Sequence, residues 1–331
     1  MAFEHPKGYV CYWTTEPITI DGHLEKPVWQ DVPWTDDFVD IEGDAKPRPR
    51  FRTRAKMRWD LDYFYLAAEM EEPHVWATLT EHDSVIFQDN DFEIFIDPDG
   101  DNHNYYEIEI NALNTEWDLR LVKPYRDGGP ALNAWEIPGL KTAVHIAGTL
   151  NDPTDTDQGW TVEFAIPWNV LGEFANCPSP PNDGDQWRVN FSRVEWEIEI
   201  VEGKYHKIVG KPEDNWVWSP QETIDMHRPE KWGYVQFSTA PVASTEFRPD
   251  PAHAVRATLH ALYEAQSAFH KAHDRWATSL EELPCTTREH PALTLLLTPE
   301  GYQATCTTLF SNGTSQHWHI RQDSRIWCED L

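Results

Sequence analysis

The chain has 331 residues, of which 56 are acidic and 27 basic, so its formal net charge is −29. So much negative charge disfavours nucleic acid and anionic membrane surfaces as partners, because both are negatively charged themselves. The hydrophobic content of 40%, with 17 Trp, 14 Phe and 11 Tyr, excludes a disordered acidic chain. The apolar stretches span only a few residues, which excludes a membrane-spanning helix, and the length predicts roughly two domains.

From Tyr9 to about Ser238 the sequence predicts short strands separated by turns. Segments of strand length are rich in aromatic and β-branched residues, and Gly-, Pro-, Asp- and Asn-rich segments lie between them. Because no long helical pattern interrupts this series, the first domain, residues 1–240, is predicted to be mainly β, an antiparallel β-sandwich. The predicted strands are 63–70, 91–97, 105–111, 160–166, 187–193 and a hairpin of 196–201 and 205–209, and the tryptophans expected in the core are Trp29, Trp59, Trp160, Trp168, Trp187 and Trp232.

Residues 241–331 have a different pattern, one helix followed by short strands. Asp250 and Pro251 are typical of a helix start. Apolar residues then recur at helical spacing to about Trp276, which predicts one long amphipathic helix. We therefore expect a small α+β extension that docks on the sandwich, with an apolar helical stripe that must pack against another surface. The stripe consists of Val255, Leu259, Leu262, Phe269 and Trp276, and the short strands are expected at 294–297, 302–307 and 316–320.

Five segments of the first domain, in chain order, resemble family 9 carbohydrate-binding modules. Ile18–Trp29 resembles the motif that starts the first strand of these modules, and Arg54–Leu66 resembles their second and third strands. Asp91–Asp97 and Gly159–Trp168 resemble two further strands, and His227–Tyr234 resembles the terminal strand. The extension lies outside the resemblance.

The resemblance, which covers about residues 9–238, implies a β-sandwich that binds a sugar between aromatic rings and holds structural calcium. It also implies a bacterial protein, secreted or periplasmic, that serves polysaccharide breakdown or uptake. An oligo- or polysaccharide is then the expected ligand, and other glycan-degrading enzymes are expected partners. The first residues, Met1–Lys7, lack the apolar stretch of a secretory signal, so the sequence itself shows no such signal.

The resemblance also indicates where the sugar binds. One aromatic wall falls at Phe87, whereas the position of the opposing tryptophan is held here by Met226 or His227. A family arginine is replaced by Glu109, and Asn111 is kept. The fold is therefore expected to match the family more closely than the ligand does.

Two further pairs of residues complete the predicted sugar site. A ring stacks on the apolar face of a pyranose, so Trp216 and Trp218, which alternate onto one face before an irregular loop, are candidates, with a place in the core as the alternative. Arg193 and Arg228 are the cations expected nearest to the site, and an arginine there would favour an anionic or modified sugar. The predicted sugar-binding residues are Phe87, Glu93, Glu109, Asn111, Arg193, Trp216, Trp218, Met226, His227 and Arg228.

One loop places a carboxylate at every second position, at Asp97, Asp99 and Asp101. Hard oxygen ligands gathered in one loop suit Ca²⁺, and the calcium loop of the family falls in the same place. The sequence therefore predicts a structural calcium site, with a solvated acidic turn as the alternative. Asp155 and Asp157 form a weaker second candidate.

An enzyme is the alternative function. Glu107 and Glu109 share one face of a predicted strand, about 7 Å apart, and Glu93 is expected to project from a neighbouring strand. A glycosidase uses two carboxyl groups separated by roughly 5–9.5 Å, so these three glutamates are the candidate catalytic residues of a hydrolase or lyase acting on glycosides. Acids also alternate with apolar residues on any half-exposed strand, so the main prediction is a carbohydrate-binding protein without catalysis.

The five cysteines, at positions 11, 177, 285, 306 and 328, lie far apart and show no C-x-x-C spacing. Buried or free thiols are therefore expected rather than a metal or redox motif. A disulfide between Cys306 and Cys328 is the leading exception.

Overall fold

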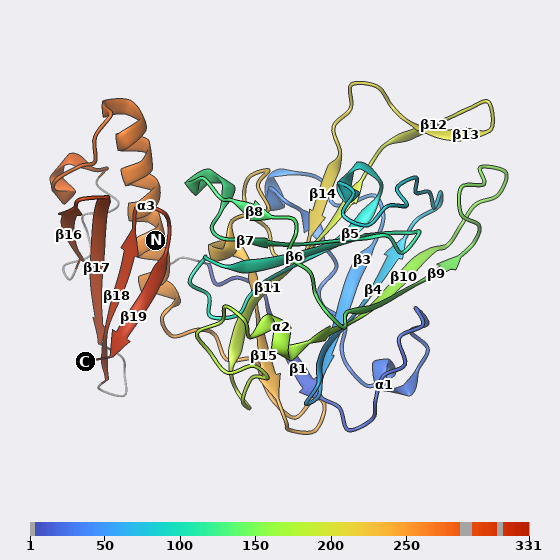
Figure 1. Cartoon of the computed structure of the whole chain (residues 1–331), viewed down its shortest axis with the longest axis horizontal. Coiled ribbons are helices and arrows are strands. Elements are labelled where there is room, and N and C mark those ends of the chain that lie inside the picture. The colour runs from blue at the N-terminus through green and yellow to red at the C-terminus, as the bar shows by residue number, and fades with distance from the viewer. Residues whose placement is uncertain (1–3, 285–292, 310–313, 331) are drawn as a thin grey trace.

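The computed structural model describes residues 4–284, 293–309 and 314–330. In this part of the chain, the first domain forms one sheet of 13 strands in the order β8-β7-β6-β5-β11-β15-β1-β3-β4-β10-β9, with β14 paired to β11 and β2 paired to β14 (Figure 1). The strands are β1 (Gly8–Trp13), β2 (Val39–Asp40), β3 (Thr53–Trp59), β4 (Tyr63–Glu71), β5 (Asp91–Asp97), β6 (Tyr105–Asn111), β7 (Glu116–Leu121), β8 (Ala131–Leu132), β9 (Lys141–Ala147), β10 (Gly159–Pro167), β11 (Gln186–Glu195), β14 (Asp214–Val217) and β15 (Gly233–Ser238).

The sheet curls so that its two halves pack face to face around the main core (Figure 1). One half contributes Ile94 of β5 and Ile108 of β6, and the other contributes Met57 of β3, Leu66 of β4 and Phe164 of β10. All six tryptophans expected in the core are buried. The predicted sandwich is therefore confirmed, and burial of its alternating apolar residues is what holds the two halves together.

Most predicted strands agree with the structure within one or two residues, and β5 and β6 have the predicted bounds. The predicted hairpin is formed by β12 (Ile198–Val201) and β13 (Lys204–Lys207). The sheet differs from a purely antiparallel one at β1, which runs parallel to both of its neighbours, β15 and β3. Two short helices, α1 (Pro27–Gln30) and α2 (Trp168–Leu171), complete the domain in the described residues.

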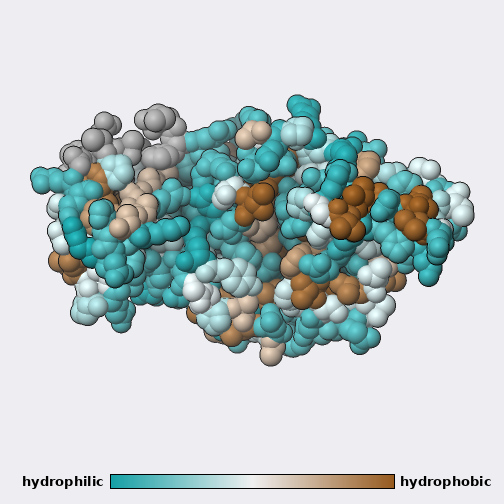
Figure 2. Space-filling model, turned by 90° about the horizontal axis from the view of Figure 1, so that it is seen from above, coloured by the Kyte–Doolittle hydropathy of each residue, from teal (hydrophilic) through white to brown (hydrophobic). Residues whose placement is uncertain are grey.

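The surface seen in Figure 2 is mostly hydrophilic, with hydrophobic residues in small separate patches. This agrees with the large excess of acidic residues over basic ones. Among the described residues, no helix combines the length and the apolar character needed to cross a membrane.

The segment Ile18–Trp29 does not start a strand, which corrects the sequence-based expectation. It forms an irregular loop, followed by the first residues of α1, around the carboxylate of Glu163, which is fully buried. The backbone N–H groups of Asp21 and Gly22 donate to this carboxylate at 2.9 and 2.8 Å, the indole of Trp29 donates at 2.7 Å, and Lys26 forms an ion pair with it. The loop therefore closes one side of the sandwich by satisfying a buried charge.

The extension consists of α3 (His253–His273) and a four-stranded antiparallel sheet. The helix starts two residues after Pro251 and ends before Trp276, because Asp274 adopts a left-handed conformation with φ of 53°. The apolar stripe packs on the extension's own sheet. The sheet contains β16 (Leu293–Thr298), β17 (Gly301–Leu309), β18 (Ser315–Arg321) and an additional strand that the sequence pattern did not predict, β19 (Ile326–Asp330).

Polar contacts join the extension to the sandwich, and many of them involve the loop between β5 and β6. Arg325 donates to the carboxylate of Asp101 at 3.0 Å, and the side chain of Asn102 donates to the carbonyl of Ser324 at 2.8 Å. Arg256 of α3 donates to a backbone carbonyl of the same loop. The loop rich in aspartate is therefore also the docking surface for the extension.

The predicted Cys306–Cys328 disulfide does not fit the strand register. Cys306 on β17 and Cys328 on β19 both lie opposite Trp318 on the strand between them. Two strand spacings separate the cysteines by about 9.5 Å, whereas a disulfide needs Cα atoms within about 7 Å. The register therefore contradicts this pairing. Cys285 lies outside the described residues.

Replacing Glu163 with alanine should destabilise the sandwich strongly. The change leaves Lys26 without its buried partner and several N–H donors unsatisfied, which costs about 3–5 kcal/mol of unfolding free energy. Urea denaturation of the variant and of the wild type measures this difference. The matched control is Glu69→Ala, because Glu69 is 32% exposed and pairs with surface arginines. An equal, small loss in both variants would contradict the role assigned to Glu163.

Candidate functional site

A hollow of about 310 Å³, here called the acidic hollow, lies over β5, β6 and β7 on the face turned away from the main core. Side chains alternate along a strand, so the residues between the core isoleucines of β5 and β6 form its floor. Segments on either side of β14 and before β15 form its rim. The side chains from the sheet are Glu93, Phe95, Glu107, Glu109 and Trp117, and those from the surrounding segments include Phe87, Tyr125, Glu213, Asp225, Met226 and His227.

The strand register concentrates carboxyl groups on this floor. Glu93 of β5 lies directly opposite Glu109 of β6, and Glu109 lies opposite Trp117 of β7. Glu107 is opposite Phe95 in the next row. All of these acids are buried, so the hollow combines carboxyl groups that have little access to water with aromatic surface.

Burial and mutual repulsion keep protons on this cluster. Burial raises the pKa of Glu93 to about 7, with a smaller contribution from the charge of Glu213. Burial, with the charge of Glu93, raises the pKa values of Glu107 and Glu109 well above the usual range. The three carboxyl groups therefore carry fewer than three charges at neutral pH and offer O–H donors as well as acceptors.

Two polar atoms of the hollow lack a hydrogen-bond partner within the described part of the chain. One is Oε2 of Glu93, and the other is the indole N–H of Trp117. Buried polar groups are normally paired, because an unpaired one costs free energy. The floor of the hollow thus contains a buried acceptor and a buried donor that no described group of the protein satisfies.

Aromatic rings stand around the carboxyl groups. Phe87 is half-buried, and its backbone N–H donates to Glu109 at 3.0 Å. Tyr125 is 50% exposed and lies edge to face with His227, with 4.4 Å between the ring centroids. Sequence reasoning missed Tyr125 and Trp117. The alternation of Glu116–Leu121 is the signal that reveals β7, and with it Trp117.

Of the predicted sugar-binding residues, the structure brings together Phe87, Glu93, Glu109, Met226 and His227. Trp216 and Trp218 are sealed in the main core and are 3% and 1% exposed, so they do not reach the hollow. The apolar interior takes both rings because their strand face points between the two halves of the sheet.

Asn111, Arg193 and Arg228 also lie outside the acidic hollow. Asn111 is fully buried, and its amide hydrogen-bonds with neighbouring backbone groups and with Asp89. Arg193 is fully buried and pairs with two glutamates, each at 2.8 Å. Burial makes this pairing obligatory, so the arginine serves the interior and not a ligand.

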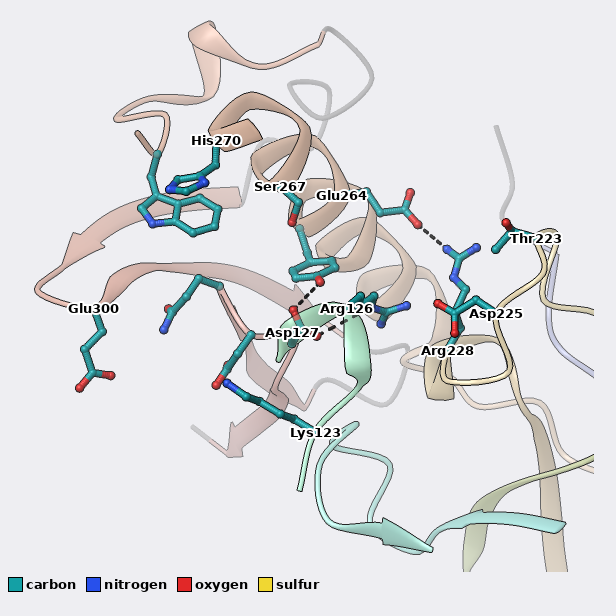
Figure 3. Close-up of a pocket in the computed structure, with 14 residues that line it drawn as sticks. Lys123, Arg126, Asp127, Thr223, Asp225, Arg228, Glu264, Ser267, His270 and Glu300 are labelled. Carbon is teal, nitrogen blue, oxygen red and sulfur yellow. Dashed lines mark hydrogen bonds and ion pairs between the residues drawn. The ribbon is translucent and has the colours of Figure 1, made fainter. Parts of the chain in front are cut away.

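Arg228 lines a larger groove of about 880 Å³ between the sandwich and the extension (Figure 3). Its guanidinium group donates to Glu264 of α3, and the neighbouring Arg126 forms two hydrogen bonds to Glu230, at 2.9 and 2.8 Å. These arginines are therefore occupied by carboxylates of the protein itself. The groove meets the acidic hollow at Asp225, which lines both.

Asp97, Asp99 and Asp101 bring one carboxylate oxygen each within 4.8 Å of the others. Burial and repulsion from its two neighbours raise the pKa of Asp97 well above the usual range. Asp157, by contrast, uses its carboxylate to accept backbone N–H groups at 2.8 and 2.7 Å, and Asp155 accepts a threonine hydroxyl. The carboxylates of the first cluster therefore face one another, whereas those of the second are engaged by donors of the protein itself.

The family model for carbohydrate family 9 binding domain-like proteins matches residues 20–238. The exoglucanase XynX of Acetivibrio thermocellus is 25% identical over 146 residues, which are 43% of this chain and 12% of that protein. This chain thus corresponds to a small part of that relative's length.

Two solved structures resemble the chain at low sequence identity. A proposed carbohydrate-binding protein from Bacteroides uniformis has a TM-score of 0.50 and 18% identity, with 70% of this chain and 100% of that one covered. A family 9 module from Caldicellulosiruptor kristjanssonii, solved with cellotriose, has a TM-score of 0.48 and 16% identity, with 73% and 100% covered. At these identities the likeness concerns the fold alone.

The raised pKa of Glu93 predicts a pH-dependent effect of the Glu93→Gln change. Folded protein holds the Glu93 proton more tightly than unfolded protein, so wild-type stability falls as pH rises from about 4.5 through about 7. The glutamine variant lacks this loss. Its free energy of unfolding should therefore rise relative to that of the wild type by on the order of 1–3 kcal/mol across that pH range. Urea denaturation at a series of pH values measures the gain, with Glu199→Gln on exposed β12 as the control. Parallel stability curves for wild type and Glu93→Gln would contradict the prediction.

Proposed function

The chain belongs to the family of carbohydrate family 9 binding domain-like proteins, and from this premise we propose that it binds a glycan or a glycan end in the acidic hollow. The observation that carries the proposal is the convergence of aromatic rings on polar atoms without partners. Phe87, Trp117 and Tyr125 offer ring surface, while Oε2 of Glu93 and the indole of Trp117 offer an acceptor and a donor. A pyranose presents an apolar face and a rim of hydroxyls, which this combination suits.

The charge of the hollow favours a neutral sugar. The arginines that the sequence suggested for an anionic sugar are engaged elsewhere, Arg193 in the interior and Arg228 at the groove. Carboxyl groups line the floor instead, and any charge that they carry repels a uronate or a sulfated sugar. The proposed ligand is therefore a neutral oligo- or polysaccharide.

The arrangement of the glutamates supports binding rather than catalysis. Glu93 and Glu109 are cross-strand neighbours on one floor, with carboxylate oxygens within 4.8 Å of each other. A glycosidase needs its acid and its nucleophile or base on two sides of the scissile bond, about 5–5.5 Å apart in a retaining enzyme and about 6.5–9.5 Å apart in an inverting one. Glu107 lies on the same floor, so it does not place a carboxyl group on the opposite side of a scissile bond. A polysaccharide incubated with the protein is accordingly expected to release no new reducing ends.

We also propose that Asp97, Asp99 and Asp101 hold a structural Ca²⁺. The donor set is oxygen only, two of the three residues are buried, and their repulsion is relieved by a cation. Arg325 neutralises part of the charge of Asp101, so the loop can carry both the metal and the extension.

The proposed biological role is to hold a polysaccharide for breakdown or uptake, beside glycan-degrading enzymes in a secreted or periplasmic setting. The support is the family itself, together with the local similarity to a curated exoglucanase.

Phe87→Ala and Trp117→Ala should each weaken retention of the cognate neutral glycan by about tenfold or more. Each change removes a ring that can stack on the sugar. Because both side chains are only half-buried, each variant should still fold. A glycan array of neutral oligosaccharides and the matching uronates, followed by affinity electrophoresis, measures retention.

The matched control for this prediction is Trp34→Ala. Trp34 is also half-buried, but it lies away from the hollow, over the side chains of Arg54 and Lys56. Unchanged retention in the two hollow variants, or equal loss in the control, would refute the location of the site.

Chelation should destabilise the sandwich if calcium binds the aspartate loop. EDTA is expected to lower the melting temperature and added CaCl₂ to restore it, because a ligand that binds only the native state stabilises it. Asp99→Ala should abolish this response, and Asp155→Ala should keep it. Differential scanning calorimetry measures the shift, and an identical response in wild type and Asp99→Ala would rule out this calcium site.

A further inference from the structure

Another cluster of metal-ligating side chains lies at the edge of the sheet, apart from both the acidic hollow and the aspartate loop. His82 and Asp83 belong to the segment between β4 and β5, Asp118 to β7, and Glu136 to the segment after β8. The ring nitrogen Nε2 of His82 lies 3.2 Å from Glu136 Oε2, 3.4 Å from Asp83 Oδ1 and 3.6 Å from Asp118 Oδ1. Three carboxylates from separate segments thus surround one imidazole nitrogen.

The histidine side chain alone cannot donate a hydrogen bond to all three carboxylates. Nε2 carries at most one hydrogen, so it can donate to one of the three oxygens. Oδ1 of Asp118 is left without a donor: the side chain is 2% exposed, and this oxygen has no hydrogen-bond partner in the described part of the chain. Burial raises the pKa of this carboxyl group to about 6. A buried acceptor that faces a histidine and further carboxylates is the environment that a bound cation would complete.

The spacing of the ligand atoms also fits a metal better than an ion pair. Charge-assisted N–H···O contacts are typically about 2.7–2.9 Å long, and all three contacts of His82 are longer. Zinc binds imidazole nitrogen and carboxylate oxygen at about 2.0–2.2 Å in a tetrahedron, whose edges are then about 3.3–3.6 Å. The contacts of His82 with Asp83 and Asp118, at 3.4 and 3.6 Å, correspond to these edges, whereas the 3.2 Å contact with Glu136 is a hydrogen bond.

We propose that His82, Asp83 and Asp118, whose ligand atoms all lie within 4.8 Å of one another, form a three-ligand binding site for Zn²⁺. The remaining oxygen of Asp118, Oδ2, accepts the backbone N–H of Ile137 at 2.6 Å, which fixes the direction of Oδ1. Such outer contacts orient ligands in metal sites. The imidazole distinguishes this site from the oxygen-only aspartate loop, which suits Ca²⁺.

The position of the zinc site gives it a structural consequence. Asp83 lies in the segment that leads to Phe87, and Asp118 follows Trp117 on β7. A bound ion would therefore tie together the two segments that carry aromatic walls of the acidic hollow.

Zinc titration of the full chain tests the proposal without any sugar. Metal-stripped protein is titrated with ZnCl₂ by calorimetry in excess CaCl₂, so that the aspartate loop is supplied with calcium. Wild type should bind one Zn²⁺ tightly, and His82→Ala and Asp118→Asn should each weaken that binding by about tenfold or more. Asparagine retains an acceptor for the N–H of Ile137, so the second variant should keep its fold.

Two controls separate this site from adventitious binding. His206→Ala removes an exposed histidine that also faces an acid, Glu199, and Asp99→Ala alters the aspartate loop. Both should bind zinc like the wild type. The proposal fails if wild type binds no zinc tightly, or if His82→Ala binds it as tightly as His206→Ala does. Because sugar plays no part in the titration, these outcomes are independent of the proposed carbohydrate function.

Discussion

The two-residue period of β5 and β6 is the constraint on which the functional face depends. Each strand sends isoleucines into the main core, so every intervening side chain must point to the opposite face. On that face the antiparallel register sets Glu93 against Glu109. A one-residue slip would drive these carboxyl groups into the core, so packing of the apolar residues fixes the position of the acids. Burial of these carboxyl groups close to one another raises the pKa values of Glu93 and Glu109.

The sequence allowed the sandwich and the acidic part of the hollow to be predicted, because alternation and strand composition are local signals. Glu93 and Glu109 were placed on neighbouring strands for this reason, and Phe87 followed from the family resemblance. The burial of Trp216, Trp218 and Arg193 could not be predicted from such local signals. Which face of a strand meets the core depends on the curl of the whole sheet, and the partners of Arg193 lie up to 140 residues away in sequence.

The loop between β5 and β6 shows how the extension is integrated with the sandwich. Its aspartates bring one carboxylate oxygen each within 4.8 Å of the others, and its neighbouring groups hold α3 and the turn before β19. The sequence indicated the aspartates but not this second use, because the contacts join residues more than 150 positions apart. The apolar stripe of α3 was correctly expected to be buried, but it is covered by the extension's own sheet. The extension therefore has a core of its own and meets the sandwich through polar contacts.

The most direct test of the central claim is to observe the hollow while a glycan binds. Met226 lines the acidic hollow, whereas Met57 and Met70 are buried in the main core. In protein labelled with ¹³C-methyl methionine, titration with the best-retained neutral oligosaccharide should shift the Met226 resonance in a saturable manner and leave those of Met57 and Met70 in place. Saturable binding of the glycan with no change at Met226 would contradict the assignment of the hollow as the sugar site.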